Sequence, residues 1–236
     1  MDEPRKALLD AAARPFLRAG RSAWHFARGK LRFDPVFFYI LRHGFLPNKG
    51  TLFDLGCGQG VLLSLILAAG RQYCCGLWPA GWPEPPQGLR LGGVERSVGR
   101  VAAARAALGA EAKIEQGDVR VSDIPSSSAI VLFDVLMYLE REEQRAVLER
   151  VLRALEPGGV LLMRETDAQG GVPYQAAKLS EQVMEIIRGR FPPRLYYRAA
   201  AEWADLLESL NLDVHSAPMS ATPLSNVLFV AKRRTG

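Results

Sequence analysis

Hydrophobic and polar positions alternate along most of the chain in blocks that favour short buried strands followed by amphipathic helices. From Thr51 onward, short apolar runs are each followed by a turn and then by a longer segment with apolar residues at helical spacing. The expected strands are 51–55, 91–95, 112–116, 129–133, 160–164, 212–215 and 226–232, and the expected helices are 61–69, 98–108, 142–155 and 202–210. Alternation of this kind predicts an α/β fold, a doubly wound and mostly parallel sheet with helices on both faces.

The residues before this alternation are expected to form a helical lid over the sheet. Residues 4–19 have apolar positions on one face of a helix. Asp34 and Pro35 are typical of a helix N-cap and of the first helical position, so a second helix is expected to follow them. We therefore divide the chain into an N-terminal helical lid, residues 1–48, and a main domain, residues 49–236.

Residues 72–90 interrupt the alternation between the first helix of the main domain and its second strand. This stretch contains Trp78-Pro79 and Trp82-Pro83, and its prolines cannot continue a helix. We therefore expect an inserted loop here. The sequence leaves two interpretations open, a lining for a substrate entrance and an ordinary surface excursion.

Length and composition indicate one globular α/β domain with a short accessory segment. The chain has 236 residues, of which 48% are hydrophobic and 23% are charged. No apolar run approaches the roughly 20 residues of a membrane span. Residues 1–4 lack the basic and apolar regions that begin a secretory signal. We therefore expect a cytoplasmic protein without a membrane span.

Charge and cysteine content narrow the classes of partner and site. The formal net charge of +5 permits an anionic partner, or a basic surface balanced locally by acidic residues. No lysine- and arginine-rich block is comparable to a nucleic-acid arm. The three cysteines, Cys57, Cys74 and Cys75, have no metal-ligand spacing, so we expect free thiols and no metal site. The oligomeric state stays open.

A glycine-rich turn after the first expected strand of the main domain is the strongest candidate for a ligand site. Gly56, Gly58 and Gly60 follow Asp54, at positions where side chains would block a ligand and where positive φ angles occur. The nicotinamide fingerprint G-x-G-x-x-G requires glycine at the position of Val61. The spacing therefore disfavours a nicotinamide dehydrogenase.

Acidic residues lie at or just beyond the ends of the first four expected strands. Ligands of open α/β sheets bind beyond the carboxyl ends of the strands. The four acids that fall there are Asp54, Glu95, Asp118 and Asp134. A single acid at such a position is as often the N-cap of the next helix. Four of them in order, together with the glycine turn, indicate a site for a polar cofactor.

Over residues 50–165 these features resemble the class I S-adenosylmethionine-dependent methyltransferases, which have a Rossmann-like fold. The resemblance implies that Asp54 helps to hold the methionine amino group, that Glu95 accepts hydrogen bonds from both ribose hydroxyls, and that Asp118 binds the adenine amino group. The residues expected around S-adenosyl-L-methionine in the main domain are Asp54, Gly56, Cys57, Gly58, Gly60, Glu95, Arg96, Asp118, Val119 and Asp134.

The lid and two later tyrosines are expected to complete the site. Lys30 or Arg32 would pair with the carboxylate of the cofactor. Tyr39 in the lid and Tyr197 near the end of the chain are candidate substrate contacts. Packing of the lid aromatics in the core is the competing interpretation.

Methyl transfer from a sulfonium is an in-line displacement with a good leaving group, so positioning of the nucleophile matters more than a base. Tyr138, after the fourth strand, is the candidate catalytic residue that lines the acceptor site. Many relatives have histidine at the position of Met137. Its absence here removes an obvious base and leaves acid-base assignments open.

The acceptor is expected to be a small, apolar or aromatic molecule methylated on oxygen or carbon. Family members that methylate amino nitrogens carry Asn/Asp-Pro-Pro-Tyr after the fourth strand, whereas this chain has Val135-Leu136-Met137 after Asp134. Residues 38–41 and 224–231 also resemble methyltransferases encoded with aryl-polyene or polyketide-type pathways. That resemblance implies a biosynthetic intermediate as acceptor, free or bound to a carrier protein.

Two alternatives of other kinds stay open. The basic charge permits an RNA or protein methyltransferase, although no separate RNA-binding domain fits in the remaining residues, so nucleic acid is disfavoured. A cofactor-binding subunit without catalysis is the second alternative, because the chain lacks an obvious base.

Overall fold

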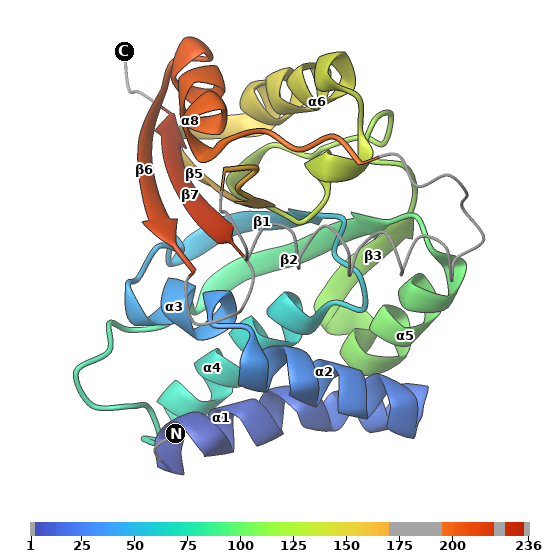
Figure 1. Ribbon diagram of the computed structural model, residues 1–236. Helices are drawn as coiled ribbons and strands as arrows, with labels where there is room; N and C mark the ends of the chain where they lie inside the picture. Colours follow the sequence, from blue (N-terminus) through green and yellow to red (C-terminus); the bar gives the residue numbers. More distant parts are fainter. Residues whose placement is uncertain (1–2, 170–194, 220–224, 234–236) are drawn as a thin grey trace.

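The computed structural model describes residues 3–169, 195–219 and 225–233. The strands are β1 (Lys49–Leu55), β2 (Gly88–Glu95), β3 (Ala112–Gln116), β4 (Ser127–Phe133), β5 (Leu155–Thr166), β6 (Leu212–Pro218) and β7 (Asn226–Arg233). Within the described ranges they form one sheet in the order β3-β2-β1-β4-β5-β7-β6 (Figure 1). β1 to β5 are parallel, and β7 is antiparallel to its neighbours β5 and β6. The predicted doubly wound, mostly parallel sheet is confirmed.

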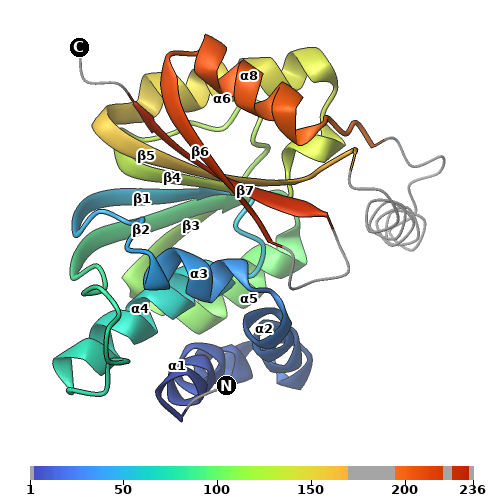
Figure 2. The ribbon, with the colours of Figure 1, turned by 60° about the vertical axis from the view of Figure 1, so that its left-hand side comes forward.

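Helices cover both faces of this sheet. They are α1 (Glu3–Ala13), α2 (Arg21–Phe33), α3 (Val36–Arg42), α4 (Val61–Cys74), α5 (Val98–Leu108), α6 (Arg141–Ala154) and α8 (Ala200–Ser209), with 3-10 turns η1 (Arg14–Ala19), η2 (Gly109–Glu111) and η3 (Leu136–Tyr138). α1 to α5 share one hydrophobic cluster with one face of the sheet, and α6 and α8 share another with the opposite face. Figures 1 and 2 show the two helical layers on opposite sides of the strands.

The central strands are apolar at almost every position because both of their faces are covered. Leu52 and Val131 pack with α1 to α5, whereas their neighbours Phe53 and Leu132 pack with α6 and α8. Successive side chains of a strand point to opposite faces. A strand between two helical layers therefore becomes a continuous hydrophobic run.

The N-terminal segment is helical, but its boundaries differ from the prediction. The helix predicted over residues 4–19 ends at Ala13, and a 3-10 turn that contains Pro15 follows it. Proline lacks the N–H that would continue the α-helix. Helix α2 was not predicted although it is amphipathic; it is polar overall, and its buried residues are Ala23, Ala27 and Leu31.

The inserted loop is shorter than the predicted 72–90, because α4 extends to Cys74 and β2 begins at Gly88. The loop, residues 75–87, lies at the edge of the sheet opposite to the glycine turn. Helix α4 runs back from the carboxyl end of β1, so its last residue and the start of β2 are both at the amino-terminal edge. The rings of Trp78 and Trp82 pack edge to face with 5.6 Å between their centres, and the ring centre of Trp82 lies 6.4 Å from that of Phe38 in α3. The loop therefore packs on α3 at the edge of the sheet away from the glycine turn, which favours its interpretation as a surface excursion.

None of the described helices is long and apolar enough to cross a membrane. In the part of the chain that the structure describes, no group of three or more His, Cys, Asp or Glu side chains is placed to hold a metal ion. The cysteines are free thiols, Cys57 buried and Cys74 and Cys75 exposed.

Candidate functional site

The turn between β1 and α4 forms the floor of the candidate site. Gly56, Gly58 and Gly60 have φ angles of 81°, 57° and 79°, which residues with side chains rarely adopt. A Cβ atom at Gly56 would collide with Val135, and one at Gly60 would lie 2.7 Å from Leu108. At Gly58 nothing lies within 4 Å of that position. The turn is therefore packed at both ends and open in its middle.

Two buried carboxylates lie beside this opening. Asp54 in β1 and Glu95 at the end of β2 are 5% and 7% exposed. Glu95 accepts hydrogen bonds from the backbone N–H groups of Gly58 (3.1 Å) and Ser97 (2.8 Å). Among the described residues, none bonds to or pairs with the Asp54 carboxylate, and burial together with Glu95 raises its pKa to about 7. A positively charged ligand group would satisfy this acid.

The glycine turn carries a second unsatisfied polar atom. The Oε1 of Gln59 is buried and has no hydrogen-bond partner within the described ranges. The thiol of Cys57 is less reactive than an ordinary exposed thiol, because burial and the neighbouring acids raise its pKa well above the ordinary value. The turn thus offers binding groups and no nucleophile.

Asp118 lies beyond β3, and Arg120 binds both of its carboxylate oxygens. The side chain of Arg120 donates to Oδ1 at 3.0 Å and to Oδ2 at 2.7 Å, and also to Glu143 at 3.0 Å. These hydrogen bonds lower the pKa of Asp118. Arg96 is exposed on the same side and adds to this effect, and Val119 is partly buried. An adenine amino group would therefore share Asp118 with an arginine.

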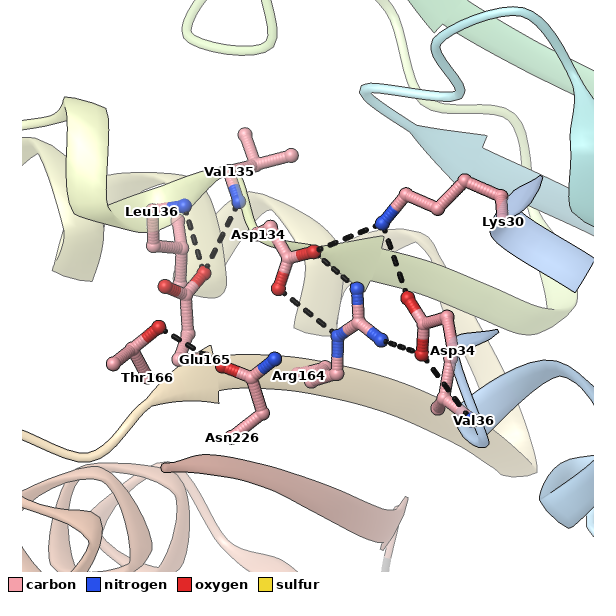
Figure 3. A network of polar contacts seen from close by, with 10 residues as sticks. All are labelled: Lys30, Asp34, Val36, Asp134, Val135, Leu136, Arg164, Glu165, Thr166 and Asn226. Atoms are coloured by element: carbon pink, nitrogen blue, oxygen red, sulfur yellow. Dashed lines mark hydrogen bonds and ion pairs between the residues drawn. The ribbon is translucent and has the colours of Figure 1, made fainter. Parts of the chain in front are cut away.

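A charged cluster joins the carboxyl ends of β4 and β5 to the N-terminal helices (Figure 3). Arg164, only 2% exposed, donates through Nε to Oδ1 of Asp134 at 2.9 Å and through a second nitrogen to Oδ2. Its third nitrogen donates to Asp34 at 2.5 Å. Burial alone would raise the pKa of Asp34, but Arg164 and Lys30 hold it below the ordinary value. Lys30 lies 3.0 Å from Asp34 and 4.0 Å from Asp134.

Glu165 fixes the loop that follows Asp134. Its fully buried carboxylate accepts hydrogen bonds from the N–H groups of Val135 (3.2 Å) and Leu136 (2.8 Å). Burial, with the nearby charge of Asp134, raises the pKa of Glu165 to about 8. Asp134 itself has a φ of 58°, a conformation that costs energy in a non-glycine residue and persists only where the surroundings impose it. Arg164 and Glu165 impose it here.

Gln144 of α6 holds the far side of the same loop. Its buried Nε2 donates to the carbonyl groups of Leu136 and Leu139, both at 3.1 Å, and of Tyr196 at 2.8 Å. Its Oε1 accepts from Arg198 at 2.7 Å. One amide side chain therefore joins the loop after β4 to the segment before α8.

The three candidate tyrosines do not all lie in the same place. Tyr138 is in η3, directly after the loop that Glu165 holds. Tyr197 belongs to the segment that a backbone hydrogen bond, Tyr196 N–H to Met137 O at 2.8 Å, brings against η3. Tyr39 instead packs on His43, at 3.9 Å between ring centres, in an aromatic group of α3 and its C-terminal turn. Core packing thus describes Tyr39 better than closure over a ligand.

The glycine turn, Asp54, Glu95 and Lys30 are candidate site residues from the sequence, and the structure adds three residues of the charged cluster and its surroundings: Asp34, Arg164 and Glu165. The predicted N-cap is one residue off: α3 begins at Val36 with Pro35 as its cap, and Asp34 caps the end of α2. Asp34 accepts from Val36 N–H at 3.3 Å and also binds Arg164. The expected strand 160–164 includes Arg164 and ends directly before Glu165. Charged residues are rarely buried unless they are paired, and that anomaly was the available signal.

Comparison with known proteins places residues 53–161 in a family described as "Methyltransferase domain". A carboxy-S-adenosyl-L-methionine synthase from Chromohalobacter salexigens is 39% identical over 119 residues, which is 48% of this chain and 39% of that protein. The chain thus spans well under half of this curated relative.

Solved structures of methyltransferases share the fold at low sequence identity. An O-methyltransferase family protein from Burkholderia thailandensis superposes with a TM-score of 0.66 and 18% identity, over 92% of this chain and 60% of the other. Magnesium protoporphyrin IX methyltransferase from Synechocystis, solved with bound SAH (S-adenosylhomocysteine), gives a TM-score of 0.58 and 19% identity over 89% and 86% of the two chains.

Proposed function

Because this chain belongs to the class I S-adenosylmethionine-dependent methyltransferases, we propose that it transfers the methyl group of S-adenosyl-L-methionine to a small, apolar or aromatic acceptor, on oxygen or carbon. The observation that carries this proposal is the opening at Gly58, flanked by the buried and unpartnered acid Asp54. Such an acid is stable next to a bound cation, and the cofactor has an ammonium group at one end.

The residues around the opening fit the cofactor in a definite order. Asp54 would accept from the methionine ammonium, and Glu95, whose oxygens point at the turn, would accept from the ribose hydroxyls. The backbone at Gly58 leaves room for the ligand to lie against it. Lys30 would pair with the cofactor carboxylate, and Asp118 with the adenine amino group. When bound, S-adenosylmethionine supplies an electrophilic methyl group on a good leaving group.

Positioning and exclusion of water are the main catalytic contributions that this chain offers. Both oxygens of Asp134 accept from Arg164, and Glu165 is buried beneath the loop, so neither carboxylate is available as a base. Tyr138 would line the acceptor site, because it lies directly after this loop. The nucleophile would be held in line with the methyl group, and its proton would leave to solvent.

The acceptor would be a biosynthetic intermediate, either free or attached to a carrier protein. The formal charge of +5 suits an acidic carrier. Of the residues on which the aryl-polyene resemblance depends, 224 lies outside the described residues, and 38–41 pack in α3. The support for this class of acceptor is therefore the sequence resemblance and the charge.

The first test is a thermal melt with S-adenosylmethionine, SAH and NAD in parallel. At 100 times its dissociation constant a ligand adds roughly 2.7 kcal/mol of stability, which shifts the melting temperature of a chain this size by about 5 to 10 °C. We expect a shift with both adenosyl compounds and none with NAD. No shift with either adenosyl compound at saturation would contradict the proposed cofactor site.

The curated relatives supply a second candidate, synthesis of carboxy-S-adenosyl-L-methionine, which 39% identity over 48% of the chain favours. The two functions leave different products. Incubation with S-adenosylmethionine and a metabolite extract, followed by mass spectrometry, would yield SAH for methyl transfer and a carboxylated cofactor for the second candidate. If the methyl group of the cofactor is labelled, label in RNA or protein would indicate a macromolecular acceptor. If no product forms at all, the chain would be a cofactor-binding subunit without catalysis.

A further inference from the structure

The charged cluster of Figure 3 connects two parts of the chain that are 130 residues apart. Asp34 lies between α2 and α3, and Arg164 lies near the end of β5. A hydrogen bond of 2.5 Å joins them. Removal of an arginine this deeply buried from its partners would be costly, so the contact is a permanent part of the fold.

The members of the cluster differ in their exposure and in how many of their hydrogen-bonding groups are already used. All three side-chain nitrogens of Arg164 are used, two on Asp134 and one on Asp34, and the residue is only 2% exposed. Lys30 is 37% exposed and uses its ammonium on Asp34. Asp134 is 28% exposed. Lys30 and Asp134 are therefore accessible to a ligand, whereas Arg164 is not.

Lys30 and Asp134 present opposite charges 4.0 Å apart. The amino-acid end of the cofactor carries an ammonium and a carboxylate on the same carbon. Its carboxylate would pair with Lys30, and its ammonium, which has three N–H groups, would pair with Asp134 as well as with Asp54. The cluster itself has two carboxylates and two cations, so its formal charge is balanced. It therefore matches a group that is charged at two points and neutral overall.

We propose that Arg164 is a positioning residue that holds Lys30 and Asp134 side by side, so that the N-terminal helices and the sheet together select the amino-acid end of the cofactor. Arg164 acts on Asp134 directly and on Lys30 through Asp34. This inference rests on the proposed cofactor site and adds that residues 30–34 are part of it.

The test compares two ligands that differ only at the end in question. SAH contains the amino-acid end, whereas 5′-methylthioadenosine has the same adenosine and sulfur without it. Dissociation constants of both would be measured by calorimetry for the full chain and for Arg164→Lys, Asp34→Asn and Lys30→Gln. Arg105→Lys is the matched control, because Arg105 also forms paired hydrogen bonds, here to the carbonyl group of Ile114.

We expect each of the three variants to weaken SAH binding by about tenfold or more, since each breaks a charge-assisted contact. Binding of 5′-methylthioadenosine should change by less than about twofold, because that ligand lacks both charged groups. Lysine at position 164 cannot reproduce the hydrogen bonds that the three nitrogens of Arg164 donate to Asp134 and Asp34, since its ammonium is a compact point charge. The control should leave both constants unchanged.

Two results would count against the proposal. Equal losses for both ligands would mean that Arg164 only maintains the fold, and unchanged SAH binding in all variants would mean that the cluster faces away from the cofactor. If Arg164→Lys does not fold, Asp34→Asn decides, because it breaks the link from Arg164 to Lys30 and leaves Lys30 itself unchanged. Failure of the unaltered chain to bind either ligand would instead overturn the proposed cofactor site itself.

Discussion

The two halves of the candidate site handle buried charge in opposite ways. On the β1 and β2 side, Asp54 and Glu95 are both acidic, and the nearest cation is the half-exposed Arg100, 3.8 Å from Glu95. On the β4 and β5 side, the carboxylates of Asp34 and Asp134 are balanced by two cations. The first half therefore carries an excess of negative charge, whereas the charges of the second half are balanced.

This difference separates a half that requires a ligand from a half that is assembled without one. Burial raises the pKa of Asp54 to about 7, because nothing compensates its charge. In the second half, cations hold the pKa of Asp34 below its ordinary value despite burial. A cationic ligand would therefore stabilise the first half strongly, whereas the second half would orient the ligand with little gain in stability.

The largest loss of SAH affinity is expected at Gly58, where the ligand would lie against the protein backbone. Gly58→Val places a branched side chain in the open middle of the turn, and we expect SAH affinity to fall by at least about a hundredfold. Gly76→Val is the matched control. Its φ of 71° and its empty surroundings resemble those of Gly58, but it follows α4 at the opposite edge of the sheet. Calorimetry that finds equal affinity in the two variants would place the ligand elsewhere.

The second prediction concerns stability without ligand and has opposite signs in the two halves. Arg164→Gln leaves Asp34 and Asp134 without their shared cation, and loss of one member of a buried pair costs about 3 to 5 kcal/mol. Asp54→Asn removes an uncompensated charge, and above pH 7 it should stabilise the chain by about 1 kcal/mol or more. Urea unfolding of both variants would measure this. Destabilisation by Asp54→Asn at pH 8 would contradict the comparison.

Much of the fold was predictable because its signals are local. The apolar runs of the buried parallel strands and the glycine turn depend on neighbouring residues, and they predicted β1 to β4 closely. Helix α2 was not predicted although its polar and apolar residues segregate to opposite faces, because it is polar overall and its buried face is limited to Ala23, Ala27 and Leu31. The start of β5 was placed late, because Pro157 and Gly158 lie inside the strand and are usual turn residues.

The site was predictable only in part, for the same physical reason. Asp54 and Glu95 follow strands at a fixed place in the chain, so their positions show in the sequence. The contact between Asp34 and Arg164 joins residues that are 130 positions apart in the chain. No local pattern encodes such a pairing. The buried charges of Arg164 and Glu165 were visible as anomalies in an apolar strand, but their partners were not.

A third prediction compares two acids expected to bind the adenosine part of the cofactor. Glu95→Ala should weaken SAH binding by about 10- to 100-fold, since hydrogen bonds to a buried charged group contribute strongly. Asp118→Ala should cost less than about tenfold, because Arg120 already occupies both of its oxygens. Circular dichroism would confirm that both variants fold. Unchanged affinity in both would reject these two assignments.

The smallest effect is a dependence on pH that separates the two halves without mutation. Folded Asp54 binds its proton more tightly than the unfolded chain does, because its pKa is raised from 3.8 to about 7. Its contribution to stability is therefore complete below pH 3.8 and is lost as the pH rises through about 7.

The ligand should respond in the opposite direction, since its ammonium pairs with the ionised acid. From pH 6 to pH 8 the ionised fraction of a group with a pKa of about 7 rises about tenfold, and SAH affinity should rise with it. Asp54→Asn should flatten this profile, whereas Asp34→Asn should lower affinity equally at every pH, because its pKa lies far below this range. Calorimetric titrations at three pH values would test both. A flat profile in the unaltered chain would mean that Asp54 does not pair with the ligand's ammonium, and that the uncompensated half of the site binds something else.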